Sequence, residues 1–323
     1  MKPLKPWLPF NEQLRQLEAR GLQFDVPAVA LDYLERLGYY RLSGYWYPLR
    51  EMDVATSQAQ GKPVRLDSFI QGSQFEHVVQ LYVFDKKLRL LALDALERIE
   101  VAVRVDIAYL LGQRDSNAHE NPACFHGNFA KKVIPYGVDK GKTEHEVWIK
   151  KYQGLLHRAR KDPSISHHMR HYGCLPIWAA IEIWDFGLLS KLFAGMKHAD
   201  QDQIAKIYGA PSGIAFAQWL RSLNFIRNVS AHHSRLWNIN VVERSAIPAD
   251  WPQELDNSRP FFYLCLMQQL LSVICPQSTW PERLIALLEN EFPKFPGGVL
   301  STADMGAFVN WRDCTPWKRH MHK

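Results

Sequence analysis

The sequence predicts an all-α protein. Apolar residues recur at every third or fourth position through most of the 323 residues, which is the spacing of one face of a helix. From Phe75 to Leu111 the chain contains neither proline nor glycine, and this run predicts one very long helix, or two consecutive ones, ending at Gly112. No segment alternates convincingly between apolar and polar residues, so no strand is expected.

Shorter helices are expected on both sides of the long one. The first two should cover residues 11–21 and 27–38. Residues 39–50, YYRLSGYWYPLR, combine aromatic and arginine side chains with a glycine and a proline, and they predict a packed loop. The polar residues 52–66 predict an exposed connection. After the long helix, helical spacing returns at 146–161, 176–195, 201–208, 213–226, 228–237, 259–275 and 281–291.

These elements are expected to form three segments of one compact unit. Residues 1–72 make an N-terminal helical and aromatic-loop segment, and residues 241–323 make a C-terminal helical extension. Between them, residues 73–240 form a helical core that contains an insert at 113–172. The first part of the insert is rich in Asn, Gly, Lys and His, which predicts a long loop.

The composition indicates a folded protein with a modest preference for polyanions. Hydrophobic residues make up 47% of the chain and charged residues 22%, as in ordinary globular proteins. Lys and Arg number 39 against 33 for Asp and Glu, and the net charge of +6 favours a polyanionic partner. Many basic proteins bind no nucleic acid, so the charge alone does not decide the function.

Several features predict a cytoplasmic protein without membrane contact. The first ten residues contain three prolines and lack the apolar stretch of a secretory signal. The longest apolar run, 261–275, is too short to span a bilayer and predicts a buried helix. The five cysteines form no CxxC pair, which argues against a disulfide framework and against a zinc site.

The most informative stretch is SLNFIRNVSAHHSRLWN at 222–238. Here an apolar helix face gives way to polar side chains that include Arg227, Asn228, His232 and His233. On an ideal helix Arg227 and His232 lie about 140° apart around the axis and about 7.5 Å apart along it. A helix break near Asn228, the reach of the arginine side chain, or a second copy of the motif is therefore needed to direct both at one point.

The stretch RNVSAHHSRLWN resembles the R-x(4–6)-H motif of HEPN ribonucleases, in the form found in abortive-infection proteins of the AbiD/AbiF type. Stretches 37–48, 95–112 and 175–193 resemble the same family in the same order. The resemblance implies an HEPN-type helical bundle, elaborated with the N-terminal helices and the long insert. It also implies a metal-independent endoribonuclease that acts as a phage-defence or toxin effector. The alternative is a non-catalytic HEPN module that binds RNA or a partner protein.

The resemblance implies partners but no cofactor. RNA is the expected substrate, and a regulatory small RNA or an antitoxin could hold the activity silent. HEPN enzymes commonly build a composite site from two domains, and the chain has only one good RxxxxH motif, that of Arg227 and His232, in a stretch that resembles the family. We therefore expect a homodimer with the apolar region 213–238 at its interface.

The chemistry of RNA cleavage fits the motif. Cleavage without a metal requires a base for the 2′-OH proton, an acid for the 5′-oxygen, and a cation for the pentacovalent phosphate. Histidine exchanges protons near neutral pH, and arginine presents a planar, permanently charged fork to phosphate oxygens. We therefore expect His232 to be the acid–base group and Arg227 to be the phosphate stabiliser. The structural alternative is that both only hold a helix junction together.

Other residues are candidates for supporting roles. Asn228 could orient a catalytic group or cap the helix that carries His232. His233 could replace His232 at the next spacing. Glu100 and Arg104 lie in the part of the long helix that matches the family and could reach the active centre. Surface ion pairs explain these two residues almost as well.

The stretch 150–171 holds six Lys or Arg residues, four histidines and one acidic residue. It predicts an RNA-contacting surface, because neutralising phosphates releases counterions and supplies sequence-independent affinity. A solvated helix face is the alternative. No carboxylate or cysteine pattern accompanies the histidines, so no metal site is expected. The residues expected to contact RNA are Lys150, Lys151, Arg158 and Arg160.

Overall fold

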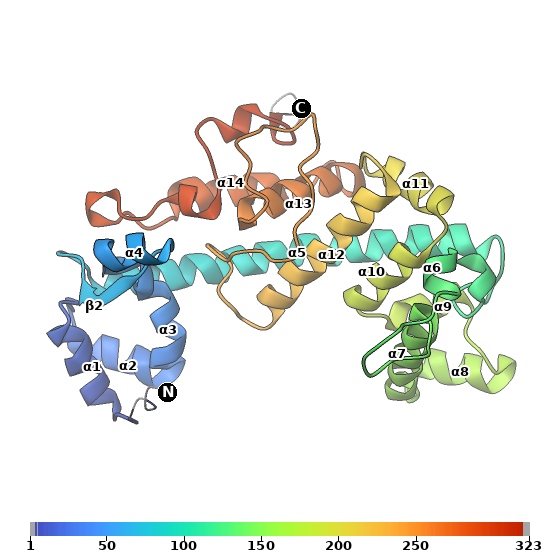
Figure 1. Ribbon diagram of the computed structural model, residues 1–323, viewed down its shortest axis with the longest axis horizontal. Coiled ribbons are helices and arrows are strands. Elements are labelled where there is room, and N and C mark those ends of the chain that lie inside the picture. Colours follow the sequence, from blue (N-terminus) through green and yellow to red (C-terminus); the bar gives the residue numbers. More distant parts are fainter. Residues whose placement is uncertain (1–3, 5, 319–323) are drawn as a thin grey trace.

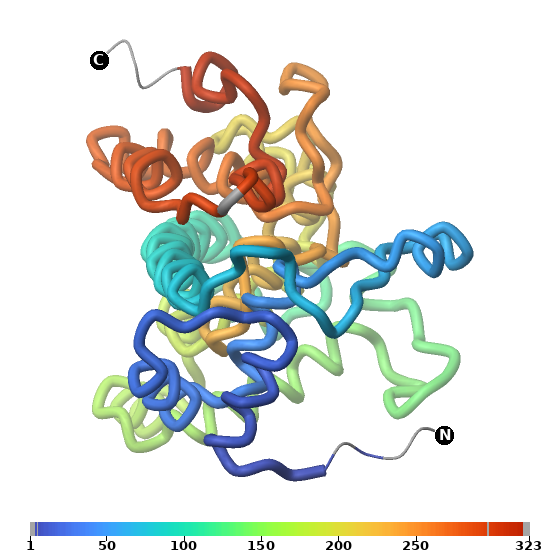
Figure 2. The backbone as a smooth tube through the Cα atoms, turned by 90° about the vertical axis from the view of Figure 1, so that its left-hand side faces the viewer, coloured from blue at the N-terminus to red at the C-terminus, as the bar shows by residue number. Residues whose placement is uncertain are grey.

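One long helix organises the fold. The computed structural model describes residue 4 and residues 6–318. α5 (Phe75–Gly112) passes through the middle of the molecule, between the N-terminal helices on one side and the C-terminal helices on the other (Figure 1, Figure 2). Its 38 residues form one helix about 57 Å long at 1.5 Å per residue. The predicted long helix is therefore confirmed as a single element.

The N-terminal segment packs against the first part of α5, and two expectations for it are wrong. Residues 39–50 begin with a helix instead of a loop, because Leu42, Tyr45 and Trp46 lie at helical spacing and are buried on one face, and Pro48 comes only after the helix has ended. Residues 52–66 contain a helix that starts where Asp53 accepts a backbone N–H three residues further on, at 2.9 Å. The elements are α1 (Phe10–Ala19), α2 (Pro27–Leu37), α3 (Tyr39–Trp46), α4 (Val54–Gln60) and the antiparallel pair β1 (Arg50–Met52) and β2 (Arg65–Phe69).

The insert and the residues after it gather at the other end of α5 (Figure 1). The helix expected at 176–195 is divided, because the chain becomes extended at Trp184 and Asp185 caps a new helix by accepting the N–H of Leu188 at 2.7 Å. α8 occupies a stretch for which no helix was predicted. The elements are α6 (Gly127–Ala130), α7 (Glu144–Ala159), α8 (Pro163–Tyr172), α9 (Ile177–Ala180), α10 (Phe186–Gly195) and α11 (His198–Ile207).

α12 (Gly213–Ala231) sets the geometry of the motif. The predicted helix boundary between 213–226 and 228–237 is wrong, because one helix runs through it and no regular helix follows before residue 260. The buried Val229 continues the apolar face of α12 past the expected break, so packing holds these residues in the helix. Beyond Ala231 the chain turns, and His233 adopts a left-handed φ of 57°.

The C-terminal helices complete the core. α13 (Pro260–Ile274) and α14 (Trp280–Asn290) lie along α5, and the indole N–H of Trp280 donates to the carbonyl of Leu91 at 2.8 Å. Every side chain from Pro260 to Leu271 is buried, which confirms the predicted buried helix. The described residues also form the short 3-10 helices η1 (Tyr47–Leu49), η2 (Pro122–Cys124), η3 (Ile181–Ile183), η4 (Pro296–Gly298), η5 (Thr302–Met305) and η6 (Trp311–Asp313).

The all-α prediction is confirmed, because 61% of the residues are helical and the only sheet in the described part of the chain is the small β1–β2 pair. One cluster of buried apolar side chains includes Trp46, Leu88 and Trp280, and so runs through all three expected segments. The division of the chain into 1–72, 73–240 and 241–323 stays a prediction.

Burial of His119 predicts a pH-dependent stability. The ring is fully buried and lies 5.1 Å from Tyr152 and 5.9 Å from Trp184 between ring centroids, and this burial lowers the pKa of His119 from 6.5 to about 4. In the unfolded chain the histidine binds a proton near its ordinary pKa, whereas in the folded chain it does so only near pH 4. The free energy of unfolding should therefore fall by about 2 kcal/mol between pH 7 and pH 5, as measured by urea denaturation.

His119→Phe is the matched variant for this measurement. Neither ring nitrogen of His119 has a hydrogen-bond partner among the described residues, so phenylalanine removes the proton-binding group at little cost to packing. The difference in stability between pH 7 and pH 5 should be smaller in His119→Phe than in the wild type by that same amount. Identical differences in the two proteins would contradict the assignment.

Candidate active site and adjoining cleft

The motif lies at the C-terminal end of α12. Arg227 and Asn228 are half-buried inside the helix, and His232 and His233 are exposed beyond its last residue. The backbone N–H of His232 still donates to the carbonyl of Asn228 at 3.0 Å, so helical geometry continues up to His232. The structural alternative for Asn228, that it caps a helix, is therefore wrong, because Asn228 lies within α12 and not at a helix start.

A hydrogen bond joins two residues of the motif but not the predicted pair. The Arg227 guanidinium donates to the side-chain oxygen of Asn228 at 3.3 Å. Among the described residues no hydrogen bond joins Arg227 to His232. Because α12 is regular up to Ala231, these two residues keep the separation of about 140° and about 7.5 Å that an ideal helix gives them.

Glu100 on α5 lies within electrostatic reach of the motif. Its carboxylate accepts a hydrogen bond from Arg104 at 2.5 Å, and the two side chains are only 13% and 15% exposed. Burial raises the pKa of Glu100, while the positive charges of Arg104 and Arg227 lower it. Arg104 also donates to the carbonyl of Trp184 at 2.6 Å. The structure thus brings Glu100 towards Arg227, whereas Arg104 joins α5 to the start of α10.

A buried carboxylate anchors the chain just after His232. Asp85 on α5 has no exposed surface and accepts the backbone N–H groups of Trp237 at 2.7 Å and Leu236 at 3.1 Å. It also accepts the Tyr45 hydroxyl at 2.7 Å and pairs with Arg89. Burial raises the pKa of Asp85, and these donors lower it. Asp85 therefore holds the motif's last residues against α5.

α3 holds the same loop from the other side. Arg41 donates to the carbonyl of His233 at 2.8 Å, and Arg235 donates to the carbonyl of Gly44. The aromatic segment at 37–48 and the loop after α12 are thus parts of one assembly. Asp85 was not among the residues predicted from the sequence to position the site. The feature that could have identified it is a carboxylate on the apolar face of a long helix, because burying an unpaired charge there costs free energy.

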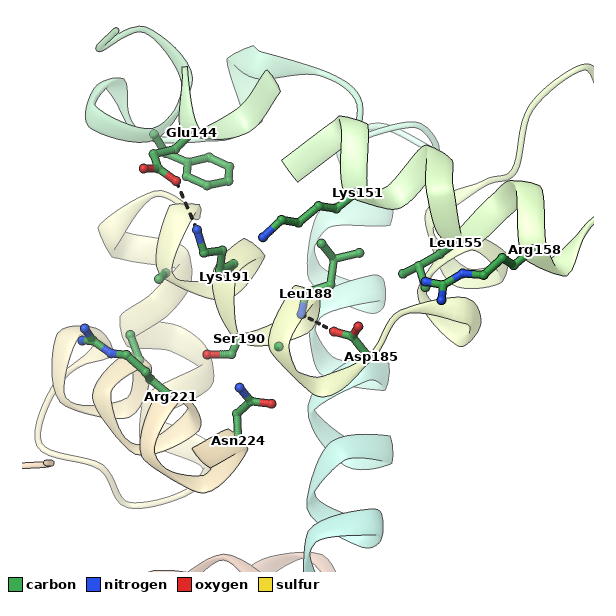
Figure 3. A pocket seen from close by; sticks show the side chains of 14 residues that line it. Glu144, Lys151, Leu155, Arg158, Asp185, Leu188, Ser190, Lys191, Arg221 and Asn224 are labelled. Atoms are coloured by element: carbon green, nitrogen blue, oxygen red, sulfur yellow. Dashed lines mark hydrogen bonds and ion pairs between the residues drawn. The ribbon is translucent and has the colours of Figure 1, made fainter. Parts of the chain in front are cut away.

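A basic cleft of about 740 Å³ lies between α7, α10 and α12 (Figure 3). We use this name for the cavity whose lining includes Lys151 and Arg158 of α7, Lys191 of α10 and Arg221 of α12. Lys191 pairs with Glu144 at 3.3 Å, and Arg221 lies 4.0 Å from Glu243.

The two cations of α7 remain without a carboxylate. Neither Lys151 nor Arg158 forms an ion pair with any described residue, and both side chains are exposed. Asp185, the one other carboxylate in the lining, accepts the N–H of Leu188 as the cap of α10. The basic cleft therefore carries an excess of positive charge.

The structure divides the four predicted RNA-contacting residues into two pairs. Lys151 and Arg158 line the basic cleft, and Lys150 and Arg160 do not. Arg160 instead lies against the ring of His157, with 3.1 Å between the guanidinium and Nδ1. Sequence reasoning missed Lys191 and Arg221, because both stand outside the basic stretch and reach the cleft only through the packing of three helices.

One face of α12 connects the basic cleft with the motif. Asn224 lines the cleft, and a Cβ on Gly187 of α10 would lie 3.5 Å from its amide nitrogen. Asn224 and His232 are eight residues apart, about 12 Å along the helix axis. At 100° per residue, a strip about 80° wide on α12 carries Arg221, Asn224, Asn228 and His232.

Two further features concern metals and membranes. Among residue 4 and residues 6–318, no three His, Cys, Asp or Glu side chains are grouped in a way that could hold a metal ion. No helix in that part of the chain is long and apolar enough to cross a membrane.

Comparison with known proteins identifies the family. The family model described as Abi-like protein matches residues 32–238, which is more than half of the chain. This range contains α5, α12 and the stretches 37–48, 95–112 and 175–193. No curated protein and no solved structure matches the chain. The chain belongs to the Abi-like protein family, and this membership indicates a role in abortive infection, a form of phage defence.

Proposed function

We propose that this protein is a metal-independent endoribonuclease of the HEPN type that acts as an abortive-infection or toxin effector. The observation that carries the proposal is the exposed His232 at the anchored end of α12, five residues after the half-buried Arg227. Glu100, whose pKa is affected by the charge of Arg227, supports it. A histidine open to solvent but fixed in its backbone is suited to move protons for a bound substrate.

The proposed reaction is an internal transfer of a phosphoryl group. A base removes the proton of a 2′-OH, and that oxygen attacks the adjacent phosphorus. The bond from phosphorus to the 5′-oxygen then breaks, and an acid protonates that oxygen. The products are a 2′,3′-cyclic phosphate and a 5′-hydroxyl. His232 is the acid–base group, and Arg227 stabilises the charge on the pentacovalent phosphate.

Asn228 and Glu100 have positioning roles in this proposal. The side-chain oxygen of Asn228 accepts a hydrogen bond from the Arg227 guanidinium, and the charge of Glu100 attracts the same group. The hydrogen bond to Asn228 limits the directions in which the guanidinium can turn, and a fixed cation stabilises a transition state better than a mobile one.

The first experiment is incubation of the purified protein with total RNA in the presence of EDTA. The proposal expects fragments that end in 2′,3′-cyclic phosphate. RNA that stays intact but is retarded on a native gel would support the alternative, a non-catalytic module that binds RNA. The basic cleft favours that alternative as a second candidate, because its unpaired cations suit binding as well as cleavage.

We further propose that the protein acts as a C2 homodimer. Each chain supplies one His232, whereas the proposed reaction needs a base and an acid, and two motifs facing one phosphate would supply both. Region 213–238 was expected at the dimer interface because it is apolar, but the apolar side chains of α12 are buried in the chain's own core. The proposed contact therefore uses the exposed polar face of α12. We also propose that a regulatory small RNA or an antitoxin holds the activity silent.

Light scattering combined with subunit mixing tests the dimer. The protein should have twice the mass of one chain at the concentration at which it cleaves RNA. A mixture of His232→Ala and Arg227→Ala subunits should stay inactive if one composite site needs both copies of both residues. A protein that cleaves RNA as a monomer would rule out the composite site.

A further inference from the structure

We propose that the basic cleft binds the phosphate backbone of single-stranded RNA and leads the strand along the face of α12 that carries Asn228 and His232. The identity of the reaction at the end of this path rests on the proposed function. The binding itself is inferred from the cleft's own charge, its size and its position relative to the motif.

The charge indicates a polyanion. Lys151 and Arg158 lie seven residues apart on α7, which places them two turns apart on the same face, both over the cleft. Neither forms an ion pair with a described residue, so each is available to a separate phosphate. Figure 3 shows Lys151 extending from α7 towards α10, with Arg221 and Asn224 on α12 across the cavity. Positive charge thus lies on two sides of the cleft, from Lys151 and Arg158 on α7 and from Arg221 on α12.

The size indicates a single strand. A volume of about 740 Å³ is in the range of pockets that enclose a small molecule, about 300–1,000 Å³. Double-stranded RNA is recognised instead across surfaces that span about 16 base pairs. A short piece of one strand fits the basic cleft, whereas a duplex contacts only its rim.

The position indicates the direction of the strand. Arg221 and Asn224 lie in the basic cleft, and Asn228 and His232 continue the same face of α12 beyond it. A strand whose phosphates contact Lys151 and Arg158 can follow these polar side chains for about 12 Å and reach the motif. The cleft therefore contributes affinity, while the reacting groups lie outside it.

The test compares two double variants that remove the same charge from the same region. Lys151→Gln with Arg158→Gln removes the two cleft cations, and Lys150→Gln with Arg160→Gln removes two neighbouring cations that do not line the cleft. Both are made in a His232→Ala background, so that the RNA stays intact during the measurement. Binding of a labelled single-stranded RNA of about 12 nucleotides is followed by fluorescence anisotropy over a range of salt concentrations.

The cleft variant should bind about 25-fold more weakly at 0.1 M salt, and the slope of log K against log salt should fall by about 1.4. These values follow from the loss of two phosphate contacts at about 0.7 each for single strands. The control variant should stay within about three-fold of the parent, since its charges face elsewhere. Equal losses in both variants, or a loss for duplex RNA as large as for the single strand, would overturn the inference.

Cleavage assays separate this inference from the proposed function. In protein that retains His232, the cleft variant should raise KM and leave kcat nearly unchanged, because it removes binding that is common to ground and transition states. If His232→Ala cleaves RNA normally, the proposed function fails whatever the binding data show. If His232→Ala is inactive but the cleft variant binds and cleaves like the control, the inference fails and the proposed function stands.

Discussion

His232→Ala is expected to lower RNA cleavage by at least about 100-fold, because general acid–base catalysis contributes about 10²–10⁴-fold to such reactions. The side chain is exposed and makes no hydrogen bond to another described residue, so its removal should leave the fold intact. The melting temperature should therefore stay within about 2 °C of the wild type. Initial rates on a labelled RNA, measured by gel electrophoresis, give the comparison.

His233→Asn is the control for this variant. His233 is the neighbouring histidine, and its φ of 57° lies in the left-handed region, which asparagine tolerates better than alanine does. Cleavage by His233→Asn should remain within a few-fold of the wild type. If His233→Asn loses activity and His232→Ala keeps it, the motif has the longer spacing and our assignment of the acid–base group is wrong.

Asp85→Ala is expected to lower the free energy of unfolding by about 3–5 kcal/mol, because it leaves the buried Arg89 without its carboxylate. It also leaves the backbone N–H groups of Leu236 and Trp237 without an acceptor. The loop that follows His232 then loses its anchor. We therefore expect cleavage to fall more than ten-fold at temperatures where circular dichroism shows the variant to be folded.

Asp94→Ala is the matched control. Asp94 pairs with Arg98 four residues later at 2.7 Å, on the same helix and at the same spacing as Asp85 with Arg89, and it also pairs with Arg283 of α14, but all three side chains are about 30–50% exposed. Its loss should cost about 1 kcal/mol or less and leave cleavage near the wild-type rate. If urea titration gives Asp85→Ala a stability within about 1 kcal/mol of the wild type, the carboxylate does not hold the loop.

The fold class, the long helix and the family could all be predicted from the sequence alone. These predictions depend on short-range patterns. Apolar residues recur every three to four positions, residues 75–111 contain no proline or glycine, and several short motifs resemble those of the family. Such patterns can be recognised in the sequence without knowledge of the tertiary structure. Arg227, Asn228 and His232 could also be named as candidates from the sequence, but their place at the C-terminal end of one continuous helix could not, since a helix boundary was predicted at residue 227.

Other local predictions failed where tertiary packing outweighed a local signal. A glycine and a proline predicted a loop at 39–50, yet α3 forms there because Leu42, Tyr45 and Trp46 are buried on one face of a helix. The polar residues after Arg227 predicted a helix break, yet the buried face of α12 extends to Val229. A glycine costs about 1 kcal/mol in a helix relative to alanine, and Pro48 lies beyond the end of α3, so packing can outweigh the local signal.

The surroundings of the motif depend on contacts between residues that are far apart in the sequence. Asp85 reaches Trp237 across 152 positions of sequence, and the basic cleft joins Lys151 to Arg221 through the packing of α7, α10 and α12. The periodicity of the sequence does not predict these contacts, because a side chain fits the pattern of its own helix whichever distant residue it contacts. The sequence therefore named the candidate reacting groups, and the three-dimensional packing decided which residues hold them in place and which cations stand beside them.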